Sequence, residues 1–134
     1  MLIYNVYVNF SRSNLIISVV NSKTNSIVLR KTCGSAGILN QWKGYDFSFL
    51  ETSQKLSYNL QKLKIKYVNI IFKGSRYSLR RKYVLKGLLF NSNVTGIKIL
   101  SIRDNTNIPF NGSKLRIRRI KRKRKSKNRL KMNR

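Results

Sequence analysis

The stretch Tyr67-Val68-Asn69-Ile70-Ile71-Phe72 decides the fold of this 134-residue chain. It is short, apolar and rich in β-branched residues, so it predicts a buried strand. Apolar residues at helical spacing predict a helix on each side of it, over residues 47–66 and 78–90, and alternation over residues 96–102 predicts one more strand. A helix that joins two strands of one sheet makes a right-handed crossover, which places those strands parallel.

The first third of the chain predicts three further strands. Residues 4–10 alternate between apolar and polar positions, and residues 15–20 and 26–32 follow after two short polar turns. Such short connections join antiparallel neighbours. The predicted order is therefore β-β-β-α-β-α-β, an α/β fold with a five-stranded mixed sheet and helices packed against it.

The start of the first helix carries two competing signals. Asp46 can cap it, and the run Ser48-Phe49-Leu50-Glu51 is typical of a capping box. Ser53 fills a gap in the apolar stripe of this helix, whose last member is Leu63. We expect one of the two capping arrangements, not both.

The charge of the chain is extreme. Thirty Lys and Arg residues stand against three acids with no His, a formal net charge of +27, while 41% of the residues are hydrophobic. Thirteen of the cations fall in residues 114–134, which leaves 17 cations and all three acids in residues 1–113. We therefore expect a folded core domain, 1–113, with a basic tail, 114–134, and a polyanion as the partner of both.

The inventory of reactive side chains argues against an enzyme. Asp46 and Glu51 are better explained as residues of a helix start, which leaves Asp104 as the remaining carboxylate. Cys33 has no His to activate it and no second Cys to pair with, and a lone Cys suggests a reducing compartment. No nucleotide-binding fingerprint is present, so we expect no catalytic residue, cofactor or metal.

Three features of the sequence bear on where the protein is expected in the cell. No run of 18 apolar residues exists, so we expect no membrane span. The first 11 residues contain no Lys or Arg, unlike a signal peptide or an Arg-rich presequence. Asn, Lys, Ile, Tyr and Phe are abundant while Pro and Ala occur once each, a bias typical of an AT-rich genome such as an organelle's.

The basic tail is the strongest functional feature. Its candidate phosphate ligands are Lys114, Arg116, Arg118, Arg119, Lys121, Arg122, Lys123 and Arg124. Each cation that neutralises a phosphate releases a counterion, so affinity should fall steeply with salt. A solvated or targeting tail is the alternative, but the acid-poor body favours nucleic acid.

A second group of cations crowds the start of the second helix. Arg76, Arg80 and Arg81 lie where the positive end of the helix dipole disfavours them, so we expect them to cost stability in the isolated protein. A phosphate bound there would make the contribution of these cations to stability favourable. The alternative is that these side chains extend into water.

A glycine-bearing loop lies between the third strand and the first helix. Its backbone amides and Lys43 could meet a phosphate, although a plain turn is the simpler interpretation of Gly34 and Gly37. Trp42 and Tyr45 could stack on bases, but aromatic residues in such loops are more often partly buried anchors.

The last third of the chain resembles a known family. Ile108-Pro109-Phe110-Asn111-Gly112-Ser113-Lys114 before a basic tail is similar to the end of the universal small-subunit ribosomal protein S-eleven. Residues 99–106 resemble that family's last strand and its exit, and residues 67–74 resemble its strand ending in lysine-glycine. Ser35-Ala36-Gly37 matches its glycine-rich turn, and residues 4–20 its opening hairpin.

This resemblance implies a sheet topology like that of ribonuclease H, without catalysis. It implies a place on the platform of the small ribosomal subunit, near the mRNA exit and the E site, where the protein binds rRNA. Ribosomal proteins S-seven and S-eighteen would be neighbours. Lys73, Asn111 and Gly112 are the residues that the resemblance adds to the rRNA-binding set.

Three departures from the family pattern are visible. Residues 75–80 replace the usual alternation of glycine and proline, Phe110 stands where the family has histidine, and the tail beyond Arg119 is longer. Together with the composition they lead us to expect a mitochondrial ribosome in the matrix rather than a plastid. The alternative from another class is an architectural DNA-binding protein of an AT-rich organelle genome, and a metal-dependent nuclease would need acid clusters that are absent.

Overall fold

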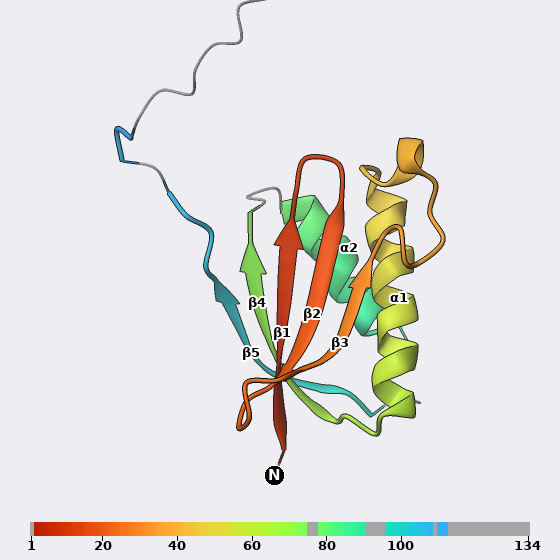
Figure 1. Ribbon diagram of the computed structural model, residues 1–134, viewed down its shortest axis with the longest axis vertical. Coiled ribbons are helices and arrows are strands. Elements are labelled where there is room, and N and C mark those ends of the chain that lie inside the picture. The colour runs from red at the N-terminus through yellow and green to blue at the C-terminus, as the bar shows by residue number, and fades with distance from the viewer. Residues whose placement is uncertain (1, 75–77, 91–95, 109, 113–134) are drawn as a thin grey trace, which may run out of the picture.

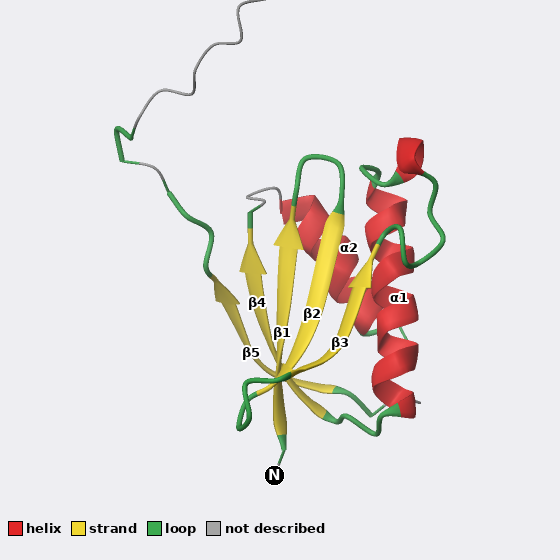
Figure 2. Ribbon diagram, viewed as in Figure 1, coloured by secondary structure: helices red, strands yellow, loops and turns green. Residues whose placement is uncertain are grey.

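A computed structural model describes residues 2–74, 78–90, 96–108 and 110–112 of the chain. Its elements lie in one α/β unit (Figure 1, Figure 2). In chain order they are β1 (Ile3–Phe10), β2 (Leu15–Asn21), β3 (Ile27–Thr32), the short 3₁₀ turn η1 (Asn40–Trp42), α1 (Asp46–Lys62), β4 (Tyr67–Lys73), α2 (Ser78–Leu88) and β5 (Lys98–Asp104).

The five strands form one mixed sheet in the order β3-β2-β1-β4-β5. β1 pairs antiparallel with β2, and β2 with β3, whereas β4 runs parallel to both β1 and β5. The α/β class with a five-stranded mixed sheet and two helices is therefore confirmed. The parallel register sets Val6 opposite Ile70 and Val8 opposite Phe72, so the apolar sets of the two central strands share a face.

The core lies between one face of this sheet and the two helices, which both cover that face (Figure 1). Every second residue of the central strands is buried there. The sequence predicted this alternation for β1, whereas β4, which was predicted to be a buried strand, is buried on one face only. The buried strand residues are Val6, Val8, Phe10, Leu15, Ile17, Val19, Val68, Ile70 and Phe72. The opposite face, which we call the open face, is covered by no helix of the described residues (Figure 2).

The boundaries of α1 differ from the predicted ones. Neither predicted cap forms: Tyr45 is the N-cap and makes no side-chain cap bond, and the Ser48 hydroxyl donates instead to the Trp42 carbonyl. The helix ends at Lys62 because Lys64 adopts a left-handed φ of 54°. The Ile65 amide then bonds the Leu60 carbonyl and the Lys64 amide the Gln61 carbonyl, which is the Schellman arrangement.

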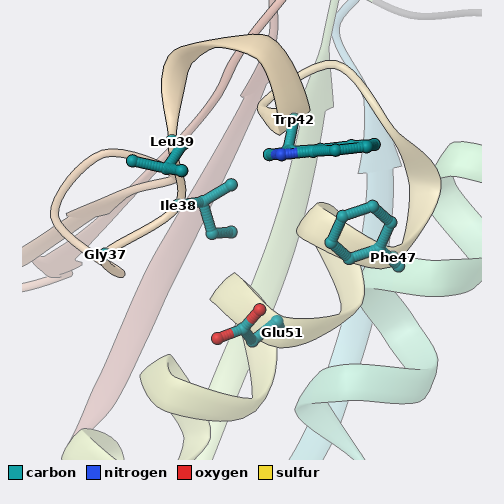
Figure 3. A pocket seen from close by; sticks show the side chains of 6 residues that line it. All are labelled: Gly37, Ile38, Leu39, Trp42, Phe47 and Glu51. Atoms are coloured by element: carbon teal, nitrogen blue, oxygen red, sulfur yellow. The ribbon is translucent and has the colours of Figure 1, made fainter.

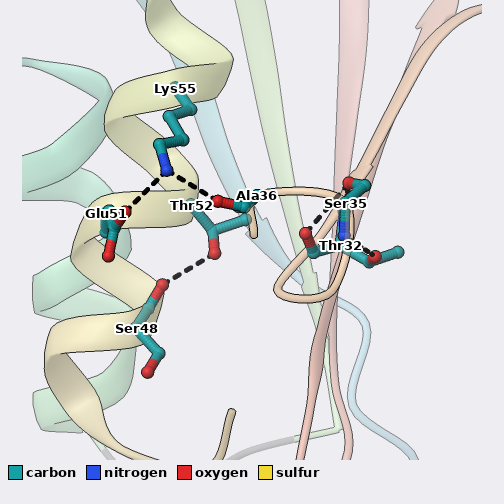
Figure 4. Close-up of polar contacts among 7 residues, drawn as sticks. All are labelled: Thr32, Ser35, Ala36, Ser48, Glu51, Thr52 and Lys55. Carbon is teal, nitrogen blue, oxygen red and sulfur yellow. Dashed lines mark hydrogen bonds and ion pairs between the residues drawn. The ribbon is translucent and has the colours of Figure 1, made fainter. Parts of the chain in front are cut away.

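The segment after β3 is tied to α1 by polar contacts (Figure 4). The Thr32 amide donates to the Ser35 hydroxyl at 2.8 Å, which closes the turn, and the Lys55 ammonium donates to the Ala36 carbonyl at 2.6 Å. The same ammonium pairs with Glu51 at 2.6 Å, one helical turn away. Cys33 is fully buried within this segment as a free thiol.

Candidate nucleic-acid interface

Segments that carry or adjoin predicted site residues lie at one end of the molecule, together with the β1–β2 turn. The β1–β2 turn, the end of β4, the start of α2 and η1 all lie at the upper end in Figure 1. Gly74 brings the end of β4 against β1: its φ is +104°, and a Cβ built on it would lie 2.3 Å from the Phe10 carbonyl oxygen. Only glycine fits this position, so Lys73 is carried directly beside the end of β1.

A polar network links α2 to the exit of β5 at this end. The Arg81 guanidinium pairs with the Asp104 carboxylate at 2.9 Å and donates to the Thr106 hydroxyl at 3.2 Å. The Thr106 hydroxyl donates to Asp104 at 2.6 Å and accepts from the Gly74 amide at 3.3 Å. This network anchors the chain where it leaves the sheet toward its basic terminus.

The network lowers the pKa of Asp104. The hydroxyl of Thr106, then Arg81, then the Thr106 amide donate to the carboxylate, and together they hold its pKa below the ordinary value of 3.8. Hydrogen bonds to the ionised form favour that form. Asp104 therefore keeps its charge, and its ion pair with Arg81, to a lower pH than a free aspartate would.

Both described arginines at the start of α2 lie against aromatic rings. The Arg80 guanidinium lies 5.5 Å from the centre of the Phe49 ring, and that of Arg81 lies 5.5 Å from the centre of the Phe72 ring. The predicted cost of cations at this helix end is therefore offset at both positions, by cation–π contact and, for Arg81, by Asp104. Arg76 falls outside the described residues.

Lys43 belongs to a loop that is packed rather than open. Its ammonium donates to the Asn40 side chain at 2.5 Å, and a Cβ on Gly34 would lie 3.2 Å from the same nitrogen. Gly44 lies beside the β1–β2 turn, because a Cβ built there would be 3.6 Å from the Ser13 Cα. The loop thus places Lys43 at the same end of the molecule as Lys73 and α2.

Three aromatic residues around this loop pack on one another. Ring centres lie 5.3 Å apart for Trp42 and Tyr45 and 6.2 Å apart for Trp42 and Phe47. Trp42 is 43% exposed while its ring packs on these neighbours, which agrees with the predicted partly buried anchor. Trp42 and Phe47 line an apolar cavity of about 380 Å³ together with Gly37, Ile38, Leu39 and Glu51 (Figure 3).

The segment that resembles the family's terminal motif leaves the body with little contact. Phe110 is 89% exposed, and Asn111 and Gly112 are exposed as well. Asn111 adopts a left-handed φ of 44°, which turns the chain there. The predicted ligands of the tail, from Lys114 to Arg124, lie outside the described residues.

The structure thus brings Lys43, Lys73, Arg80 and Arg81 to one end of the molecule. Asn111 and Gly112 lie in the segment that follows β5. Asp104 and Thr106, the partners of Arg81, were not among the predicted site residues. Their spacing of two residues is typical of an Asx-type turn, but the pairing with α2 has no local signal.

No protein-family model matches this chain, and no curated protein matches it. Within the described ranges, no helix is long and apolar enough to cross a bilayer. The same part of the chain contains no group of three or more His, Cys, Asp or Glu side chains that could hold a metal ion.

Proposed function

We propose that this chain is a structural rRNA-binding protein of the small subunit of a mitochondrial ribosome, of the S-eleven family. The observation that carries the proposal is the distribution of charge. The three acids of the chain serve the protein itself: Asp104 pairs with Arg81, Glu51 pairs with Lys55, and Asp46 opens α1. The surplus of cations is left for an external polyanion.

The fold gives secondary support to the proposal, which depends mainly on the charge distribution. The strand order β3-β2-β1-β4-β5, with the helices on one face, agrees with the ribonuclease H-like topology that the resemblance implies. The chain leaves β5 beside Arg81 and continues into the terminal motif at residues 108–112. Body and tail would therefore meet RNA from the same end of the molecule.

In this proposal the protein neutralises phosphate repulsion where rRNA helices converge on the platform, near the mRNA exit and the E site. Lys43, Lys73 and Arg80 contact phosphates from the body, and the tail threads between helices. Ribosomal proteins S-seven and S-eighteen are the expected neighbours, with mRNA close by. The mitochondrial matrix is the expected compartment.

Sedimentation of a mitochondrial extract tests the proposal. We expect the chain to co-migrate with the small subunit and to be released by high salt, because its contacts are largely electrostatic. Recovery in free, low-mass fractions alone would refute it.

Ultraviolet crosslinking then separates rRNA from the alternative, an architectural protein on organelle DNA. A crosslinked pool dominated by small-subunit rRNA supports the proposal. A pool dominated by DNA would replace it with the alternative.

A further inference from the structure

The open face of the sheet has a composition unlike that of its covered face. The strand register aligns one residue from each of the five strands in a continuous row, Arg30–Ser18–Tyr7–Ile71–Arg103. Tyr7 lies at its centre and is 37% exposed, and both arginines, on the edge strands, are exposed. A cation therefore stands at each end of a row with an aromatic ring in the middle.

Contacts on either side of this row fix which face it belongs to. Ser101, two residues before Arg103, donates to Asn69 at 3.0 Å, and Asn69 donates to Asn5 at 3.2 Å, so these side chains share the face of Tyr7. Asp104 points to the helix side, where it meets Arg81. Leu29 packs against the core, which leaves its neighbour Arg30 on the open face.

The open face is free of negative charge. The three acids of the chain lie on α1 and at the helix side of β5. The cations whose register places them on the open face are Arg30, Lys73, Lys98 and Arg103. A surface of this kind complements a polyanion, whereas an apolar protein partner would bury these cations unpaired.

The centre of the row favours bases over a duplex backbone. A tyrosine held on the open face of a sheet offers its ring for stacking, and only unpaired nucleotides expose a base face to it. Four strand spacings separate Arg30 from Arg103, about 19 Å at the usual distance between strands. That span allows phosphates on both sides of a stacked base to reach an arginine.

We infer that the open face binds an unpaired segment of RNA, with Tyr7 stacking on a base and Arg30 and Arg103 contacting the flanking phosphates. The inference rests on the proposed function for the identity of the nucleic acid. It adds a second surface, which shares Lys73 with the upper end, and it specifies the kind of RNA bound there as a single strand rather than a helix. Asn5 and Asn69 lie beside the stacked base, where their amides can bond its edge.

The test uses the full chain and a fluorescein-labelled, non-self-pairing oligoribonucleotide, alone or annealed to its complement. Fluorescence anisotropy is measured at raised salt, where stacking persists and phosphate contacts weaken. Tyr7→Leu should weaken binding of the single strand about tenfold, since stacking contributes about 1–3 kcal/mol per base. Tyr7→Phe should retain it, and the duplex should bind both variants as it binds the natural chain.

Tyr58→Leu is the matched control, because Tyr58 is an exposed tyrosine on α1. A second pair compares Arg30→Gln/Arg103→Gln with Lys62→Gln/Lys86→Gln, which removes the same charge from the helices. The first double variant should bind the single strand more weakly than the second. Thermal melting of each variant confirms that it folds.

Equal binding by the Tyr7→Leu and Tyr58→Leu variants would overturn the inference, as would an equal loss on the duplex. Equal binding by the two double variants would also overturn it. In all these outcomes the natural chain still binds RNA, so the proposed function stands. A natural chain that binds neither RNA at any salt concentration would overturn the proposed function instead.

Discussion

Ser53 of α1 lies directly against Gly87 of α2. A Cβ built on the glycine would lie 2.6 Å from the Ser53 Cβ and 2.6 Å from the Leu50 carbonyl oxygen. Ser53 is fully buried, and its hydroxyl donates to the Phe49 carbonyl at 2.7 Å within its own helix. The two helices can therefore approach backbone to backbone at this point.

Gly87→Ala should destabilise the protein although alanine is the better helix former. The added methyl group overpacks the contact with α1, which costs about 1–3 kcal/mol and outweighs the helix-propensity gain of about 1 kcal/mol. Urea unfolding measures the change in free energy. Gly112→Ala is the control, because a Cβ there meets nothing within 4 Å, and an equal effect of both variants would contradict the packing argument.

Arg81→Gln should lower the stability of the free protein. The substitution removes the ion pair with Asp104 and the contact with the Phe72 ring, so we expect the Tm to fall by a few degrees. Lys82→Gln removes the same charge from the adjacent, exposed position and should leave the Tm nearly unchanged. A Tm for Arg81→Gln at or above that of the natural protein would show that the helix dipole outweighs these contacts.

Acid should weaken the protein through Asp104. Its pKa is lower in the folded state than in the unfolded state, so the carboxylate stabilises the fold at any pH above its unfolded value of 3.8. This contribution is lost as the pH falls through the folded pKa. The difference in unfolding free energy between the natural protein and Asp104→Asn should be largest near neutrality and vanish in strong acid, and a difference independent of pH would refute the assignment.

Removal of residues 114–134 should weaken RNA binding and flatten its salt dependence while the core stays folded. The segment carries 13 cations, and each phosphate that the shortened chain no longer neutralises reduces the slope of log K against log salt by about 0.7–0.9. Binding of an rRNA fragment over a salt series measures the slope, and circular dichroism checks the fold. An unchanged slope would mean that the tail does not bind phosphates.

The strands were predictable because their signal is local. Val6, Val8 and Phe10 alternate with polar residues, and burial on one face follows from that period alone. The end of α1 was predicted four residues too late, because a non-glycine residue, Lys64, takes the left-handed conformation that closes the helix. The favourable burial of Ile65 after the turn is a tertiary effect that no local pattern reports.

The candidate site was predictable only in its charges. The concentration of Arg80 and Arg81 at a helix start can be read from the chain, but the partner of Arg81 is 23 positions away, at the end of β5. The packing of α2 against the sheet, not sequence spacing, brings the two together. The row through Tyr7 is also non-local, because strand register assembles it from one residue of each of the five strands.

The burial of Cys33 makes its thiol a probe of local opening. A thiol reagent can attack this sulfur only after the segment between β3 and α1 has opened, so the rate of labelling reports how often that opening occurs. Because the chain has one cysteine, each equivalent of reagent consumed counts one opened molecule. Bound RNA that stabilises the segment between β3 and α1 would slow the labelling of Cys33.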